Sequence, residues 1–130
     1  PGAIPASARV RHLGYVPDGD LPALYAGATV CISTAQWIVP LTLLEAQACG
    51  TPGLAFNTPS AREVLRSGAI LVPPGDTAAL AEACVSLFQD GARRRELAGA
   101  GLANARRFTW DRTAREVLGV YRRVVRNGGA

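Results

Sequence analysis

The 130-residue sequence contains no lysine and no methionine, and it has a single histidine. All fourteen of its basic side chains are therefore arginines, and the formal net charge is +4. An arginine-only composition rich in alanine and glycine indicates a genome bias more than a nucleic-acid surface, so we expect no nucleic acid as a partner. We interpret the run Arg93–Arg95 as the solvated face of a helix, with an anionic partner as the alternative.

Long apolar runs are also absent. No run approaches the roughly 20 residues that a membrane-spanning helix needs, so we expect no transmembrane segment. The cysteines are odd in number and lie in apolar contexts without CxxC spacing: Cys31, Cys49 and Cys84. They are typical of reduced core residues, which favours a cytoplasmic protein. His12 has no Cys or His at ligand spacing, so we expect no metal site.

The length and the 48% apolar fraction indicate one globular domain with a real core. The chain begins at Pro1 rather than at a methionine, and its first residues show no signal-peptide pattern. We interpret this start as that of a processed or truncated product.

Short apolar segments alternate with segments of helical periodicity along the chain. Strands are predicted over residues 9–16, 29–33, 53–57 and 69–74. Helices are predicted over 21–28, 42–49 and 60–65, followed by three more that begin near residues 77, 92 and 109, the last reaching about 126. The pattern predicts an α/β fold, a partial Rossmann-like domain of about four parallel strands with helices on both faces.

Several predicted helices carry a start signal. Asp20 and Asp76 each stand where an N-cap residue is expected. Thr42–Glu45 and Ser60–Glu63 have the spacing of a capping box, in which two side chains satisfy the first backbone amides. The last helix places four apolar residues on one stripe, by which we expect it to pack: Trp110, Val117, Tyr121 and Val124.

Two predicted loops are candidates for a binding site. Parallel sheets bind ligands at the carboxyl ends of their strands, beside helix N-termini. The turn Gly14–Asp18 follows the first predicted strand, and the loop Thr34–Thr42 follows the second. Spacing alone therefore predicts a crevice for a small ligand and no particular chemistry.

The order of the motifs is more specific than any one of them. The segments "HLGYVPDGDLPALYAGATVCIST", "LTLLEAQACGTPGLAFN", "SAREVL", "AILVPPGDTAALAEA" and "RFTWDRTAREVLGVYRRV" follow one another between residues 9 and 125. Together they resemble the C-terminal, donor-binding half of retaining family 4 glycosyltransferases of the GT-B fold. The resemblance implies transfer of a sugar from a nucleotide diphosphate sugar to an acceptor with retention of configuration. It implies no metal and no other cofactor.

The resemblance also implies roles for particular residues. Glu45 matches an acid that binds the ribose hydroxyls, and Trp37 stands where the family has another acid that touches the donor sugar. The turn at residues 14–16 matches the one that contacts the base, and Asp18 approaches the base edge. The candidate nucleotide and donor contacts are Gly14, Tyr15, Val16, Asp18, Trp37, Val39, Leu41, Thr42 and Glu45. No catalytic residue is assigned in this chain.

Structural alternatives stand beside these roles. Glu45 has capping-box spacing, Trp37 can pack against another part of the protein, and Asp18 suits a turn. Glu63 is a helix cap more readily than a catalytic acid. Pro40 replaces a glycine of the family pattern and has no N–H to offer a ligand.

Two functions from different classes follow. The chain is interpreted as the later part of a glycosyltransferase's donor-binding domain, inactive alone because the diphosphate-gripping cations, two first strands and the acceptor domain are not found in it. The alternative is a non-catalytic nucleotide-binding or assembly module. Without those strands, 9–16 or a neighbour has an unpaired edge, so we expect a partner: the remaining half of the enzyme or a second copy.

Overall fold

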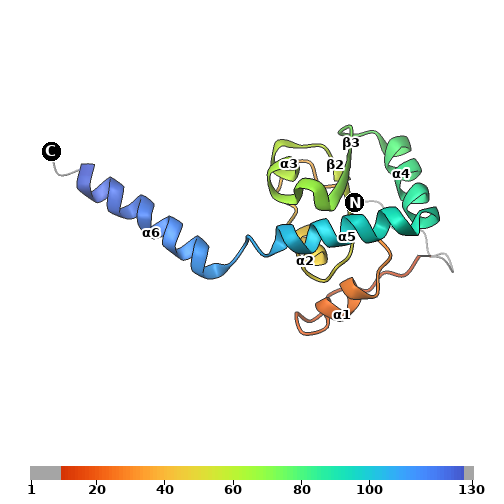
Figure 1. Ribbon diagram of the computed structural model, residues 1–130, viewed down its shortest axis with the longest axis horizontal. Helices are drawn as coiled ribbons and strands as arrows, with labels where there is room; N and C mark the ends of the chain where they lie inside the picture. Colours follow the sequence, from red (N-terminus) through yellow and green to blue (C-terminus); the bar gives the residue numbers. More distant parts are fainter. Residues whose placement is uncertain (1–9, 128–130) are drawn as a thin grey trace.

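The computed structural model describes residues 10–127, an α/β domain from which one helix extends (Figure 1). At its centre is a parallel sheet in the order β1–β2–β3, formed by β1 (Cys31–Ser33), β2 (Gly53–Phe56) and β3 (Ala69–Val72). The register places Cys31 and Ala69 on either side of Gly53. All of β2 is buried because it is the central strand. The predicted α/β fold with a parallel sheet is confirmed.

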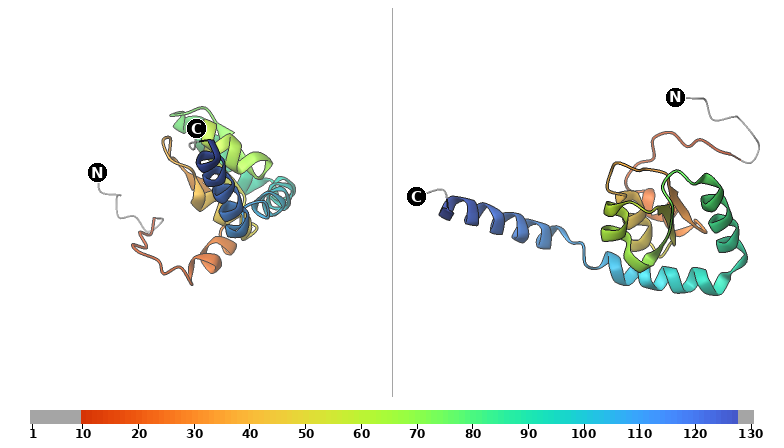
Figure 2. Two further views of the ribbon diagram at one scale, coloured as in Figure 1. Left: turned by 90° about the vertical axis from the view of Figure 1, so that its left-hand side faces the viewer. Right: turned by 90° about the horizontal axis from the view of Figure 1, so that it is seen from above.

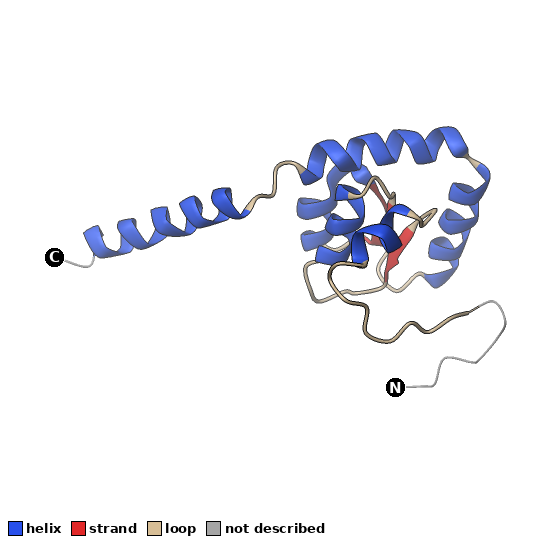
Figure 3. Ribbon diagram, turned by 90° about the horizontal axis from the view of Figure 1, so that it is seen from below, coloured by secondary structure: helices blue, strands red, loops and turns tan. Residues whose placement is uncertain are grey.

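Helices precede and follow the strands along the chain. They are α1 (Leu21–Ala26), α2 (Leu41–Ala48), α3 (Pro59–Leu65), the 3₁₀ turn η1 (Arg66–Gly68), α4 (Thr77–Gln89), α5 (Gly91–Ala105) and α6 (Trp110–Asn127). Figure 3 shows helices around the sheet, with α6 apart from them. None of the helices described between residues 10 and 127 is long and apolar enough to cross a membrane.

The core lies on both faces of the sheet. Successive side chains of a strand point to opposite faces. Ala55 therefore packs on one face with Leu43 of α2 and Leu65 of α3, whereas Leu54 and Phe56 pack on the other face, which α4 covers. The prediction of helices on both faces is confirmed.

The strand predicted over residues 9–16 is wrong. Residues 10–16 form no strand apart from an isolated bridge at Val10, and Arg9 lies outside the described residues. A strand needs a hydrogen-bonded neighbour and a face to bury, whereas Val10 and Leu13 are exposed. The described residues thus form three strands rather than about four. β1 is an edge strand of this sheet, and 44% of the surface of its Ile32 is exposed.

The start of α2 also differs from the prediction. The helix begins at Leu41 with Pro40 as its N-cap residue, and no side chain caps it. The predicted Thr42–Glu45 capping box is therefore wrong, because Thr42 already lies inside the helix. Glu45 lies in the second turn, not the first, and its carboxylate is not used at the helix start.

The N-caps of the other helices agree with the predicted ones only in part. Asp76 caps α4, its Oδ1 accepting from the Ala79 N–H at 2.9 Å, as predicted. Asp20 occupies the N-cap position of α1 but makes no side-chain cap hydrogen bond. At α3 the predicted Ser60 cap is wrong: the Thr58 hydroxyl accepts from the N–H three residues later, at 3.1 Å.

A buried polar cluster joins α2, α3 and α5. Asn104 of α5 donates from Nδ2 to Gln47 Oε1 at 2.8 Å and to the Val64 carbonyl at 2.7 Å. Gln47 of α2 is fully buried, and its Nε2 donates to the Leu65 carbonyl at 3.0 Å. Both amide side chains are therefore satisfied inside the core, which makes their burial tolerable.

The backbones of η1 and α5 lie very close to each other beside Gln47. A Cβ on Gly68 of η1 would lie 2.5 Å from the Gly101 Cα and 2.6 Å from Gln47 Nε2. A Cβ on Gly101 of α5 would lie 3.0 Å from Gln47 Cγ. Glycine at both positions lets α5 and η1 meet directly over the Gln47 side chain.

The last helix does not pack as predicted. Figures 1 and 2 show α6 extending away from the rest of the domain. Trp110 is 88% exposed and Tyr121 is 65% exposed, although both belong to the stripe predicted to be buried. The helix itself is amphipathic, with its apolar residues on one side and its arginines on the other. Its apolar face has no cover among the described residues.

Candidate functional site

The loop after β1 leads directly into α2. Trp37 is 94% exposed, and Ile38 and Val39 are exposed beside it. The Ser60 hydroxyl donates to the Ile38 carbonyl at 3.5 Å, which ties the loop to α3. Trp37 makes no packing contact that buries it within the described residues, so its indole is open to a ligand or another part of the protein.

Backbone hydrogen bonds already use several N–H groups at the start of α2. The Leu41 N–H donates to the Val39 carbonyl at 2.9 Å, and the Pro40 carbonyl accepts from the Leu43 and Leu44 N–H groups. Pro40 is buried and has no N–H. This stretch therefore offers few backbone donors where the resemblance implies several.

Glu45 accepts a hydrogen bond from a residue that the sequence did not single out. Tyr25, near the end of α1, donates from its hydroxyl to Glu45 Oε2 at 3.0 Å. Burial, followed by the hydrogen bond and negative charge of Glu45, raises the pKa of the Tyr25 phenol to about 12. The phenol is therefore a hydrogen-bond donor at any physiological pH.

The charge of Glu45 also reaches β1. Burial, followed by the negative charge of Glu45, raises the pKa of the Cys31 thiol, while a hydrogen bond from the Ile32 backbone lowers it. Cys31 is the first residue of β1, on the face of the sheet that α2 covers. One carboxylate thus lies where α1, β1 and α2 converge.

A hollow of about 390 Å³ borders the same carboxylate. One side is the outer face of α2, and the other is the segment that joins α5 to α6. It is lined by Leu41, Leu44, Glu45, Ala48, Ala105, Phe108, Thr109, Trp110 and Thr113. Of the two tryptophans, Trp110 and not Trp37 borders it. The hollow is apolar apart from Glu45 and two threonines.

The candidate residues before α1 lie outside this hollow. Gly14 has a positive φ of 65°, which glycine adopts without strain, and Tyr15 is 85% exposed. Val16 is half-buried and Asp18 is exposed in the turn that precedes α1. The structure thus brings Leu41 and Glu45 to one hollow and leaves the 14–18 turn and Trp37 outside it.

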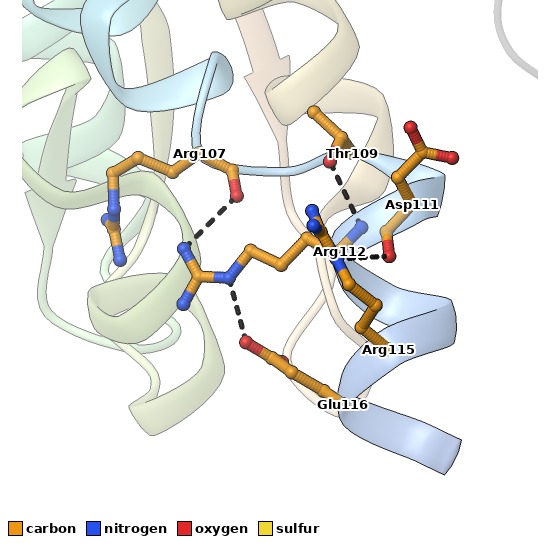
Figure 4. Close-up of polar contacts among 6 residues, drawn as sticks. All are labelled: Arg107, Thr109, Asp111, Arg112, Arg115 and Glu116. Atoms are coloured by element: carbon orange, nitrogen blue, oxygen red, sulfur yellow. Dashed lines mark hydrogen bonds and ion pairs between the residues drawn. The ribbon is translucent and has the colours of Figure 1, made fainter. Parts of the chain in front are cut away.

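The guanidinium of Arg112, at the start of α6, is a candidate for binding an anion, but it is already paired (Figure 4). Arg112 Nε donates to Glu116 Oε1 at 2.7 Å, and Nη1 donates to the Arg107 carbonyl at 3.4 Å. Its backbone N–H donates to Thr109 Oγ1 at 3.2 Å. The contacts with Arg107 and Thr109 hold the first turn of α6 to residues 106–109, which join it to α5. Between residues 10 and 127 no group of three or more His, Cys, Asp or Glu side chains could hold a metal ion.

The arrangement of the sheet and its helices is that of the GT-B glycosyltransferase fold. The structure superposes on sucrose-phosphate synthase from Thermosynechococcus elongatus with a TM-score of 0.82 and 29% sequence identity, over 92% of this chain and 31% of that chain. The family model for glycosyl transferases group 1 matches residues 3–90. The chain belongs to this glycosyl transferases group 1 family.

Curated relatives extend the same comparison. O-antigen chain mannosyltransferase B of Escherichia coli is 33% identical over 87% of this chain, and phosphatidyl-myo-inositol mannosyltransferase of Mycobacterium leprae is 36% identical over 92%. D-inositol 3-phosphate glycosyltransferase of Salinispora tropica is 38% identical over 90%. The chain spans only 30%, 33% and 25% of the lengths of these relatives.

Proposed function

We propose that this chain is the donor-binding part of a retaining glycosyltransferase and that Glu45 binds the ribose of a nucleotide diphosphate sugar. The observation that carries the proposal is that the Glu45 carboxylate is accessible and has no structural role at the start of a helix. It is exposed, it caps no helix, and it borders the hollow beside α2. Family membership supports the reaction class, and the names of the relatives all describe sugar transfer or sugar-phosphate synthesis.

A carboxylate suits ribose because it accepts hydrogen bonds on both oxygens, whereas the ribose hydroxyls donate them. The start of α2, at Leu41 and Thr42, would present the positive end of the helix dipole to the diphosphate. Trp37 and Val39 would lie over the sugar, since an exposed indole can stack on the apolar face of a sugar ring. These side chains bind and orient the donor, and the proposal assigns none of them a proton transfer.

The base is proposed to lie against the turn before α1. Gly14, Tyr15, Val16 and Asp18 supply an exposed aromatic ring, a carboxylate and a backbone turn of the kind that contacts a flat heterocycle. The proposal includes no metal ion, so EDTA should leave nucleotide affinity unchanged. We also infer a cytoplasmic protein, because Cys31, Cys49 and Cys84 are all free thiols.

We infer that another part of the enzyme covers the apolar face of α6. Trp110, Tyr121 and Val125 are exposed on this face, and the edge of β1 is unpaired in the described sheet. The chain spans only 25–33% of the lengths of the relatives, which favours the remaining half of the enzyme over a second copy. The test is light scattering of this chain, first alone and then mixed with the rest of the native polypeptide as a separate chain. If this chain stays monomeric in both cases, the inference is contradicted.

The ribose assignment is tested by titrating uridine, guanosine and adenosine diphosphates into the native polypeptide that carries these residues. Glu45→Gln should weaken the tightest of these complexes more than tenfold, because hydrogen bonds to a charged acceptor are worth about 1.5–3 kcal/mol. Glu63→Gln, an exposed acid on α3, is the matched control and should have no effect. Equal affinities for wild type and Glu45→Gln would refute the assignment.

A further inference from the structure

Tyr25 joins α1 to α2 at two points. Its hydroxyl donates to Glu45 Oε2 at 3.0 Å, in the middle of α2. Its backbone carbonyl accepts from the Thr51 hydroxyl at 2.5 Å, just after the end of α2. Thr51 is buried, and this second contact is partly shielded from solvent. Figure 1 shows the short helix α1 beside α2, consistent with these contacts.

The two contacts fix where the phenol lies. The Ala28 N–H donates to the same Tyr25 carbonyl at 2.9 Å, so the backbone of the last turn of α1 is tied on two sides. The side chain is half-buried, which removes much of its freedom. A donor held in this way holds one oxygen of a flexible glutamate in one place.

Without such a donor, an exposed glutamate on a helix samples several rotamers. Each rotamer places the carboxylate differently, so the side chain loses conformational entropy when a ligand binds to one rotamer only. In this structure Oε2 is occupied by Tyr25, and Oε1 has no hydrogen-bond partner among the described residues. One carboxylate oxygen is therefore anchored while the other stays available to a ligand.

We propose that Tyr25 is a positioning residue for nucleotide binding, which acts by anchoring Glu45 Oε2 so that Oε1 faces the ribose hydroxyls. This inference rests on the proposed function of Glu45. It assigns Tyr25 no contact with the sugar or the diphosphate. The same link holds α1, and with it the turn at residues 14–18 that precedes α1, against the helix that carries the ribose-binding acid.

The test compares ribose with deoxyribose. The nucleoside diphosphate that binds the native polypeptide most tightly is titrated alongside its 2′-deoxy counterpart into wild type, Tyr25→Phe, Glu45→Ala and the double variant. Tyr25→Phe should weaken the ribonucleotide complex roughly threefold to tenfold, the range expected for one hydrogen bond. It should weaken the deoxyribonucleotide complex less, because the carboxylate that Tyr25 orients has fewer hydroxyls to bind there.

Two controls separate positioning from loss of structure. Tyr121→Phe removes a hydroxyl from α6, away from the residues proposed to bind the nucleotide, and should change neither affinity. In the Glu45→Ala background, Tyr25→Phe should have no further effect, since Tyr25 acts only through the missing carboxylate.

The outcomes are distinguishable. If Glu45→Ala leaves the ribonucleotide affinity and the ribose preference unchanged, the ribose assignment fails and takes this inference with it. If Glu45→Ala weakens binding while Tyr25→Phe does not, the ribose assignment stands and this inference is overturned. Equal weakening of both nucleotides by Tyr25→Phe, or a full effect in the Glu45→Ala background, likewise overturns it in favour of a structural role.

Discussion

The side chain of Asn104 donates to Gln47 Oε1 at 2.8 Å, a contact between α5 and α2 that lies inside the core. Gln47 is two residues beyond Glu45, on the buried side of the same helix. The contact therefore sets where α2 lies, and through it where the candidate ribose acid is presented. The stability of the domain and the geometry of the site depend on the same helix.

Removing the Asn104 amide should destabilise the domain. Asn104→Ala leaves Gln47 Oε1 and the Val64 carbonyl without their donor in a buried place, and such a loss costs about 1–3 kcal/mol. Urea denaturation followed by far-UV circular dichroism measures the change. Gln89→Ala, at an exposed end of α4, is the control and should cost little. Equal stability of the two variants would contradict the importance of the buried cluster.

Two glycines of α5 should respond in opposite directions to the same substitution. Gly101→Ala places a Cβ 3.0 Å from Gln47 Cγ, and a fully buried side chain has little room to move, so we expect a loss of about 1–3 kcal/mol. Gly99→Ala meets nothing within 4 Å and should gain up to about 1 kcal/mol from better helix propensity. Thermal denaturation of both variants provides the comparison. A stabilised Gly101→Ala protein would show that α5 and α2 are less closely packed than described.

The thiol of Cys31 should report the charge of Glu45. Because that charge contributes to the raised pKa of Cys31, Glu45→Gln should lower the pKa and speed alkylation by iodoacetamide at pH 8. Cys49→Ala and Cys84→Ala are introduced first, so that only one thiol reacts. Glu63→Gln in the same background should leave the rate unchanged. Identical rates in the Glu45→Gln and Glu63→Gln proteins would place Glu45 farther from β1 than the structure does.

Tyr25 should give the fold a distinctive dependence on alkaline pH. Its folded pKa of about 12 lies above the ordinary value, so its hydroxyl stabilises the fold fully below about pH 10. That contribution is lost as the pH rises through 12. The difference in unfolding free energy between wild type and Tyr25→Phe should therefore shrink over this interval. Tyr25→Phe retains every other titrating group of the chain, so a pH-independent difference between the two proteins would contradict the hydrogen bond.

The sequence predicted the alternation of strands and helices well, because buried strands such as β2 are continuous apolar runs with glycine or proline beside them. It failed at residues 10–16, where an apolar pattern is present but none of the strands described between residues 10 and 127 pairs with it. It also failed at α2, because the Thr42–Glu45 spacing is a capping box only if the helix starts two residues later than it does, at Leu43 instead of Leu41.

The contact between Tyr25 and Glu45 could not be predicted from spacing, since 20 residues separate them. A weaker signal existed: the helices on either side of 29–33 belong to consecutive units of a parallel sheet, and such helices often lie side by side. The packing of α6 could not be predicted for a different reason. An amphipathic stripe indicates that a helix has an apolar face to bury, but it does not identify the element or the chain that packs against this face.

The exposure of both tryptophans has a practical consequence for any study of this domain. Trp37 is 94% exposed and Trp110 is 88% exposed, and the chain contains no other tryptophan. Their fluorescence emission already comes from indoles surrounded by water, so unfolding should shift its wavelength very little. A sugar stacked on Trp37, or a protein surface laid over Trp110, would move either indole into a drier environment and shift the emission to the blue. The intrinsic fluorescence of this chain is thus a poor reporter of folding and a direct reporter of association.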